Sequence, residues 1–242
     1  MRLIEPDWPR HPRVRACVTT REGGVSPTPY DSLNLAGHVG DDPANVAENR
    51  RRLRASLDLS QEPAWLEQVH GTQVLHIDHR HVIAAADAAW TDVPHTPCVI
   101  MSADCLPVLF ADDDGTCVAA AHAGWRGLAA GVLEQTVEAL PTMRSKLTAW
   151  MGPAIGPTAF EVGADVLDAF EKTMQVPAGA FVPKPSGRYW CDLNLLARTR
   201  LANLGITRVH GGHDCTHSDP SRFFSHRRDG ACGRIASMVW LG

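Results

Sequence analysis

The chain has 242 residues, of which 44% are hydrophobic and 21% are charged, and its formal net charge is −4. This composition is typical of a globular protein, and the length suits one domain. The slight negative charge argues against a protein that binds nucleic acid mainly through phosphate contacts, and no segment reaches the roughly 18 consecutive apolar residues of a membrane helix.

The first residues and the cysteines together predict a cytoplasmic protein. The opening segment contains Glu5 and Asp7, where a secretion signal needs an apolar run. The seven cysteines are odd in number, scattered from Cys17 to Cys232 and without a CxxC pair. Because this pattern suits neither a disulfide framework nor a zinc ribbon, we expect free thiols in a reducing compartment.

Three helices are expected from their caps and apolar periodicity. The first has Asp42 as its N-cap, proline at its first position and an end near Leu59. The second is expected to start near Val162, since apolar residues then recur at every fourth position. The third is expected to run from Asp192 as the cap to Gly205 as the stop.

Apolar runs between these helices predict short strands. They are residues 17–20, 72–77, 99–101, 108–111, 117–121, 147–151 and 236–241. Because the strands alternate only loosely with the helices, we expect an α/β fold of the α+β kind in a single domain, 1–242, and not a purely parallel sheet.

Two of these strands bring a cysteine close to a histidine. Residues 107–110 and 117–121 are typical of an antiparallel hairpin with the four-residue loop 112–115. In this register Cys105 lies directly opposite His122, and opposed side chains share one face of a sheet. A thiolate and an imidazole could then share one metal ion or one proton, although a slip of one residue would separate them.

A second histidine completes a candidate metal site. His122 precedes a glycine-rich turn and an Ala- and Leu-rich stretch to Leu140 that looks helical, and such a junction suits an anion. His70 is also followed by glycine, at the entrance to an expected strand. Two histidines and Cys105 would leave tetrahedral Zn²⁺ one position for water, as in catalytic zinc sites. A thiol hydrolase with Cys105 as nucleophile and His122 as base is an alternative.

Further side chains are candidates for other sites. The arginines that could bind phosphate are Arg21, Arg126, and Arg227 together with Arg228. Asp104 and Glu161 are carboxylates that could move protons. Four potential metal ligands also crowd a polar loop, where we interpret them as surface residues without excluding a metal; they are His210, His213, Cys215 and His217.

Six motifs follow one another along nearly the whole chain, from Thr19 to Leu241. They are TTREGGVSPTPYDSLNL, QVHG, ADCLPV, HAGWRG, GPAIGP and FFSHRRDGACGR. In this order they resemble the polyphenol oxidase or laccase-domain family, regarded as zinc-dependent purine nucleoside phosphorylases. The resemblance implies a sandwich of mixed β-sheets flanked by helices, and a monomer.

The resemblance also implies an activity and a set of site residues. It implies phosphorolysis of adenosine, inosine, guanosine and S-methyl-5′-thioadenosine, together with deamination of adenosine. The implied partners are therefore purine nucleosides and phosphate, with neither nucleic acid nor membrane. It implies a zinc site and a substrate pocket; the zinc ligands are His70, Cys105 and His122, and the pocket residues are Arg21, Asn34, Asp104, Glu161 and Arg227.

Copper is the alternative metal, because the older family name denotes a copper-dependent oxidation of phenols. Multicopper oxidases use many histidines in paired HxH spacing, and the sequence has one such pair, His79 and His81. A site with two histidines and one cysteine suits zinc equally well.

Overall fold

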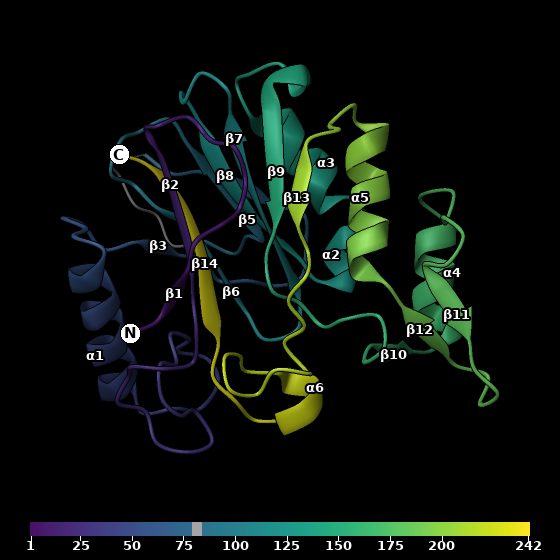
Figure 1. Cartoon of the computed structure of the whole chain (residues 1–242), viewed down its shortest axis with the longest axis horizontal. Coiled ribbons are helices and arrows are strands. Elements are labelled where there is room, and N and C mark those ends of the chain that lie inside the picture. Colours follow the sequence, from purple (N-terminus) through teal and green to yellow (C-terminus); the bar gives the residue numbers. More distant parts are fainter. Residues whose placement is uncertain (79–83) are drawn as a thin grey trace.

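Two β-sheets packed against each other form the centre of the protein (Figure 1). The computed structural model describes residues 1–78 and 84–242. The five-stranded sheet consists, in spatial order, of β1 (Leu3–Ile4), β2 (Val14–Thr19), β14 (Ile235–Leu241), β6 (Cys98–Ser102) and β3 (Ala64–Trp65). The six-stranded sheet consists of β13 (Val209–Gly211), β9 (Leu147–Met151), β7 (Leu106–Asp112), β8 (Val118–Ala123), β5 (Ala88–Thr91) and β4 (Val74–His76). Both sheets are mixed, since β3 is parallel to β6, and β4 to β5.

Apolar side chains that alternate along the strands fill the space between the two sheets. In β2, Val14, Ala16 and Val18 are buried in this core, together with Leu109 of β7 and Val118 of β8 from the opposite sheet. Successive side chains of a strand point to opposite faces, so every second residue reaches the shared core. The remaining residues face outward, toward the helices.

Helices cover the outer face of each sheet and complete a four-layer sandwich (Figure 1). On the five-stranded sheet, α1 (Pro43–Ser56) buries Leu53 in a core with Met238 of β14. On the six-stranded sheet, Leu133 and Leu196 share a core with Phe110 of β7. The helices on this side are α2 (Trp125–Ala130), α3 (Val132–Ala139) and α5 (Leu193–Asn203). The expected sandwich of mixed sheets flanked by helices is confirmed.

The remaining elements lie at the margins of the sandwich. A small sheet stands beyond α5 in Figure 1, with a helix packed beside it. These elements are β10 (Glu161–Val162), β12 (Tyr189–Cys191), β11 (Phe181–Pro183) and α4 (Ala164–Glu171). The short helices are α6 (His226–Asp229) and a 3-10 turn, Arg144–Lys146. None of the helices within residues 1–78 and 84–242 has the length and apolar character needed to cross a bilayer.

The caps of two expected helices are confirmed. The Asp42 carboxylate accepts the backbone N–H of Ala44 at 2.8 Å, and the Asp192 carboxylate accepts that of Leu195 at 2.9 Å. These bonds satisfy N–H groups that have no partner within the first turn of a helix. The first helix ends at Ser56, slightly before the expected end.

The second expected helix is confirmed, and the Ala- and Leu-rich stretch needs correction. The helix expected to start near Val162 is α4, which begins at Ala164 after the N-cap Gly163, while Val162 itself lies in β10. The Ala- and Leu-rich stretch forms two helices, because Gly131 between them has a φ of 101°, which interrupts the helical path.

The hairpin forms with a register that differs from the expected one by two residues. Pro107, and not Cys105, lies opposite His122. The turn is centred one residue further along the chain than expected. The backbone N–H of Asp112 donates to the carbonyl oxygen of Cys117 at 3.3 Å, and the Asp112 carboxylate accepts the backbone N–H groups of Thr116 at 2.7 Å and Cys117 at 3.0 Å. Since side chains alternate with a period of two, this shift keeps Cys105 and His122 on the same face.

Candidate metal centre

Three potential metal ligands meet at one end of the six-stranded sheet. His70 lies in the turn before β4, Cys105 directly before β7, and His122 near the end of β8. Their ligand atoms all lie within 4.8 Å of one another. In the described part of the chain this is the one such group of histidine, cysteine and carboxylate side chains. The structure therefore brings together the three residues singled out from the sequence.

The other proposed ligands do not form such a group. Among the described residues, the three histidines and the cysteine of the polar loop do not gather around a common point. These residues are His210, His213, Cys215 and His217. Cys215 instead accepts the backbone N–H of Gly156 at 3.1 Å. The paired histidines His79 and His81 lie outside the described residues.

Asp87, which the sequence analysis missed, contacts the two histidines of the cluster. Its carboxylate is 2.8 Å from Nδ1 of His122 and accepts the backbone N–H of His70 at 2.9 Å. Metal-binding histidines commonly bond their second ring nitrogen to such a carboxylate. The available sequence signal was an acidic residue inside the alanine-rich run 84–89, where a buried strand begins.

The electrostatics of the cluster favour a thiolate beside an imidazolium when no metal is bound. Burial raises the pKa of the Cys105 thiol, but His122 and His70 outweigh burial and lower that pKa from 9.0 to about 6. Burial likewise lowers the pKa of His122, but Cys105 and Asp87 raise it to about 9. Cys105 is therefore the group in this cluster best suited to act as an anionic ligand or as a nucleophile.

The donor set fits a zinc ion. Zinc binds imidazole nitrogen and thiolate sulfur, and three protein ligands leave a position open for water or substrate. The Cys105 sulfur and Nε2 of His70 are 3.8 Å apart, so these two donors already face a common point. Gly124 keeps the space free, because a Cβ atom there would lie 2.9 Å from the Cys105 sulfur.

In the metal-free protein, we expect Cys105 to react with iodoacetamide at neutral pH. The pKa of about 6 means that the thiolate forms as the pH rises through 6, so the rate should rise there and then level off. Cys17 and Cys191 are buried thiols. Burial, together with a nearby carboxylate, raises the pKa of each to about 12, so they should react slowly. Peptide mass spectrometry after timed alkylation measures each site.

Zinc should protect Cys105 in the same experiment. Cys215 is the internal control, because it lies outside the cluster. Burial raises the pKa of Cys215, but hydrogen bonds from Ser218 and Gly156 outweigh burial and lower it. Labelling of Cys215 should not change with zinc, and equal labelling of Cys105 with and without zinc would contradict its role as a ligand.

A pocket of about 180 Å³ opens beside the cluster. Its walls combine the cluster with aromatic and apolar side chains and two arginines. They include His70, Asp104, Cys105, Trp125, Arg126, Ile155, Phe160, Leu193, His226 and Arg227. The pocket therefore offers potential metal ligands, positive charge and flat apolar surface within one space, which suits a planar ligand with an anionic partner.

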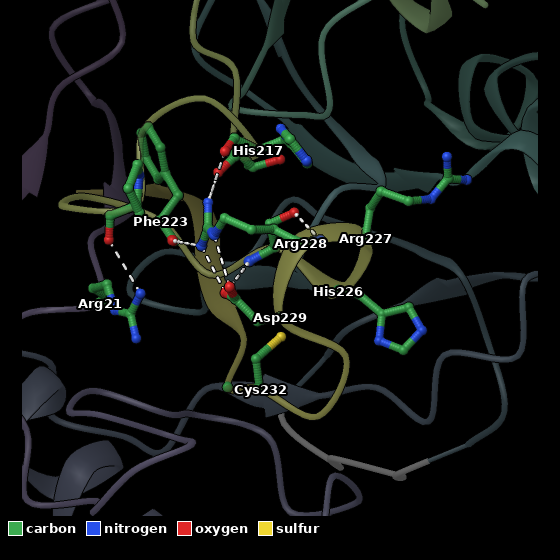
Figure 2. Close-up of polar contacts among 12 residues, drawn as sticks. Arg21, His217, Phe223, His226, Arg227, Arg228, Asp229 and Cys232 are labelled. Carbon is green, nitrogen blue, oxygen red and sulfur yellow. Dashed lines mark hydrogen bonds and ion pairs between the residues drawn. The ribbon is translucent and has the colours of Figure 1, made fainter. Parts of the chain in front are cut away.

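Two neighbouring arginines of α6, Arg227 and Arg228, have different surroundings. Figure 2 shows Arg228 pointing toward the backbone of His217 and Phe223, whereas Arg227 points away from them. The Arg228 guanidinium donates to the carbonyl oxygens of His217 at 2.9 Å and Phe223 at 3.0 Å, and pairs with Asp229 at 2.6 Å. Arg228 thus ties the segment around α6 together and leaves Arg227 to line the pocket.

Asp104 links the cluster to this segment. One carboxylate oxygen accepts the Thr216 hydroxyl at 2.7 Å, and the other accepts the backbone N–H of Arg227 at 2.7 Å. Asp104 has a φ of 94°, a left-handed conformation that is strained in a residue with a side chain. These two bonds hold it there, beside Cys105 and at the pocket wall.

Basic residues of the turn between β11 and β12 pair with Glu161, which does not line the pocket. Its carboxylate pairs with Lys184, and with Arg188 at 2.7 Å. The hydrogen bond from Lys184 lowers the pKa of Glu161, so this carboxylate is ionised at neutral pH. Its backbone oxygen accepts a hydrogen bond from the Arg227 side chain at 2.8 Å.

Arg21 and Asn34 lie away from this pocket. The Arg21 guanidinium donates to the carbonyl oxygens of Asp31 at 2.9 Å and Pro220 at 3.1 Å, and it lines a different surface hollow. Asn34 is fully buried, and its amide bonds to Asp41 at 2.9 Å and to Ala36. Both side chains join loops to one another in this structure.

The chain is similar to known proteins over its whole length. A purine nucleoside phosphorylase of Pseudomonas aeruginosa is 56% identical over 239 residues, covering 98% of each chain. The purine nucleoside phosphorylase YfiH of Escherichia coli is 51% identical over 241 residues, covering 99% of each chain. These two matches cover nearly the whole chain.

Solved structures and a family model agree with this likeness. The crystal structure of a Neisseria meningitidis protein matches with a TM-score of 0.96 and 46% identity, covering 100% of this chain and 99% of the other. YlmD from Geobacillus stearothermophilus matches with a TM-score of 0.87 and 32% identity, covering 95% and 92%. The model of the multi-copper polyphenol oxidoreductase laccase family matches residues 15–242. The chain therefore belongs to this laccase family.

Proposed function

We propose that this protein is a purine nucleoside phosphorylase that also deaminates adenosine. The observation that carries the proposal is the pocket at the His70, Cys105 and His122 cluster, in a chain whose full-length relatives are named purine nucleoside phosphorylases. The substrates we propose are adenosine, inosine, guanosine and S-methyl-5′-thioadenosine, with phosphate as the second substrate. The seven free cysteines support a cytoplasmic location, and we propose a monomer.

The cluster would hold Zn²⁺ through its two imidazoles and its thiolate. Bound there, zinc would supply a Lewis acid, which lowers the pKa of water and polarises a substrate atom. The three ligands differ in their exposure to solvent: His122 is buried, Cys105 is partly exposed, and His70 is exposed. The open side of the site thus lies toward the pocket.

We propose that Arg126 and Arg227 bind the phosphate. Within the described residues, the Arg126 guanidinium has no hydrogen bond or ion pair, and its carbon lies 4.4 Å from the centroid of the Trp125 ring. Arg227 lies 5.3 Å from the centroid of the Phe160 ring and retains further N–H groups for a ligand. Two arginines at one wall can position an anion for attack on the sugar and balance its charge.

The aromatic and apolar wall is suited to the purine base. Trp125 and Phe160 present flat rings beside the arginines, and Leu193 and Ile155 complete the apolar lining. In our proposal Asp104 and Glu161 serve proton transfer, and Asp104 is the better placed, because it lines the pocket beside Cys105. The ionised state of Glu161 suits a base and not a proton donor.

The proposal is tested by incubating the zinc-loaded protein with adenosine, with and without phosphate, and separating the products by chromatography. Adenine that appears only with phosphate would establish phosphorolysis. Inosine that forms without phosphate would establish deamination. If neither product forms, the proposed function is wrong.

Two alternatives have specific support and are separated by metal content. The laccase family name favours copper and phenol oxidation, since imidazole and thiolate ligands also bind copper. The contact of His122 with Asp87, beside the low-pKa thiol of Cys105, resembles the arrangement of a thiol hydrolase. Elemental analysis of the purified protein distinguishes them, because the hydrolase would act without metal, and oxidation would require copper.

A further inference from the structure

One buried carboxylate, that of Asp87, bonds to both histidine-bearing segments of the metal centre. Asp87 is fully buried directly before β5. One oxygen lies 2.9 Å from the backbone nitrogen of His70 and 2.8 Å from Nδ1 of His122. The other accepts the backbone N–H groups of Val69 at 3.1 Å and Gly71 at 2.6 Å. An ionised carboxylate has about four lone-pair directions, so these four contacts use its full capacity.

The contacts to residues 69–71 hold His70 in an otherwise disfavoured backbone conformation. His70 has a φ of 61°, in the left-handed region that residues with side chains seldom adopt. Three consecutive N–H groups converge on the Asp87 carboxylate, as backbone groups do around a bound anion. The turn that presents the His70 ring is therefore shaped around this carboxylate.

The contact to His122 determines which ring nitrogen faces the cluster. A carboxylate has no proton to give, so Nδ1 of His122 carries the hydrogen and donates it. In the neutral ring Nε2 is then the nitrogen with a free lone pair. The backbone N–H of His122 also donates to the carbonyl oxygen of Asp87, at 2.6 Å, which fixes the strand position of the ligand.

We propose that Asp87 is the positioning residue of the metal centre, since a single carboxylate sets the backbone of His70 and the ligand nitrogen of His122. This inference rests on the proposed metal centre and goes beyond it, because Asp87 lies outside the set of ligands. It predicts that metal affinity depends on a residue that does not touch the metal.

The test is the substitution Asp87→Asn, which keeps the size and changes one acceptor into a donor. In one orientation the amide NH₂ group faces the backbone N–H of His70 and Nδ1 of His122. In the other it faces the backbone N–H groups of Val69 and Gly71. If the NH₂ group faces His122, the ring relieves the conflict by moving its proton to Nε2, which then cannot bind metal. We expect the zinc affinity to fall about 10- to 100-fold, measured by competition with a chromogenic chelator in the absence of nucleoside.

Asp112→Asn is the matched control. Asp112 is also buried, and its carboxylate also accepts backbone N–H groups, those of Thr116 and Cys117, but it is the last residue of β7, at the hairpin turn and outside the cluster. The two variants should lose comparable stability in thermal unfolding, while Asp112→Asn should keep its zinc affinity within about threefold. The inference is overturned if Asp87→Asn also stays within threefold, or if both variants lose affinity equally.

A measurement on the unsubstituted protein keeps the inference testable if the variant does not fold. Long-range ¹H–¹⁵N spectra of the zinc-loaded protein should show Nδ1 of His122 protonated and Nε2 bound to zinc. Zinc on Nδ1 would overturn the inference. Neither measurement uses nucleoside, so a failure of the phosphorolysis assay would refute the proposed function and leave this inference standing.

Discussion

Cys105→Ala should abolish both zinc binding and phosphorolysis. The side chain is the one sulfur donor in the cluster, and its removal leaves two imidazoles, of which one, His70, is exposed. Since loss of a residue that merely supports a ligand already costs about 10- to 100-fold in affinity or activity, loss of the ligand should cost more than about 100-fold. Bound zinc per chain and the rate of adenine formation with phosphate measure the two effects.

Cys98→Ala is the control for this substitution. Cys98 is a fully buried cysteine of β6, and its replacement removes a sulfur atom from the core without touching the cluster. It should leave zinc content unchanged and lower only the stability. If the Cys105→Ala protein retained the wild-type rate with no bound zinc, the zinc mechanism would be wrong. If it bound zinc normally, Cys105 would not be a ligand.

Arg227→Ala and Arg126→Ala should weaken the use of phosphate much more than the use of nucleoside. Each arginine can make charge-assisted hydrogen bonds to phosphate, and loss of such bonds corresponds to about a 10- to 100-fold effect. We therefore expect kcat/KM for phosphate to fall by this factor in each variant. Initial rates measured over a phosphate series at saturating nucleoside test the expectation.

A control variant and a second reaction test whether the effect is specific to phosphate binding. Arg144 is an exposed arginine paired with Glu138 at 2.8 Å, outside the pocket, and Arg144→Ala should leave the phosphate dependence unchanged. Deamination does not use phosphate, so inosine formation should fall less than adenine formation in the Arg126 and Arg227 variants. If the phosphate dependence of Arg227→Ala equals that of the unsubstituted protein, the assignment of this arginine is wrong.

The hairpin illustrates how far local rules lead. Apolar runs and turn residues predicted both strands, and the structure confirms β7 and β8. The register was wrong by two residues, because Asp112 pairs with Cys117 and its carboxylate accepts N–H groups from Thr116 and Cys117, which centres the turn one residue later. The grouping of Cys105 with His122 survived this error only because strand side chains alternate with a period of two.

The placement of the charged candidates shows where such rules end. Arg21 and Asn34 lie within the first motif and Glu161 lies shortly after another, but each also has a partner from a distant segment: Pro220 for Arg21, Arg234 for Asn34, and Lys184 for Glu161. Arg126 and Arg227 do reach the pocket. A motif records which side chains are present, whereas the direction of each one depends on contacts that only the folded chain creates.

The sequence by itself determined the element types, the helix caps and the pairing of a cysteine with two histidines, because these follow from local periodicity and residue chemistry. Only the tertiary structure decided that Asp87 supports both histidines, since Val69, His70 and Gly71 reach its carboxylate from a different segment of the chain. A buried carboxylate is stable only where several donors converge on it, and such convergence is a property of the packed sheet, not of neighbouring residues.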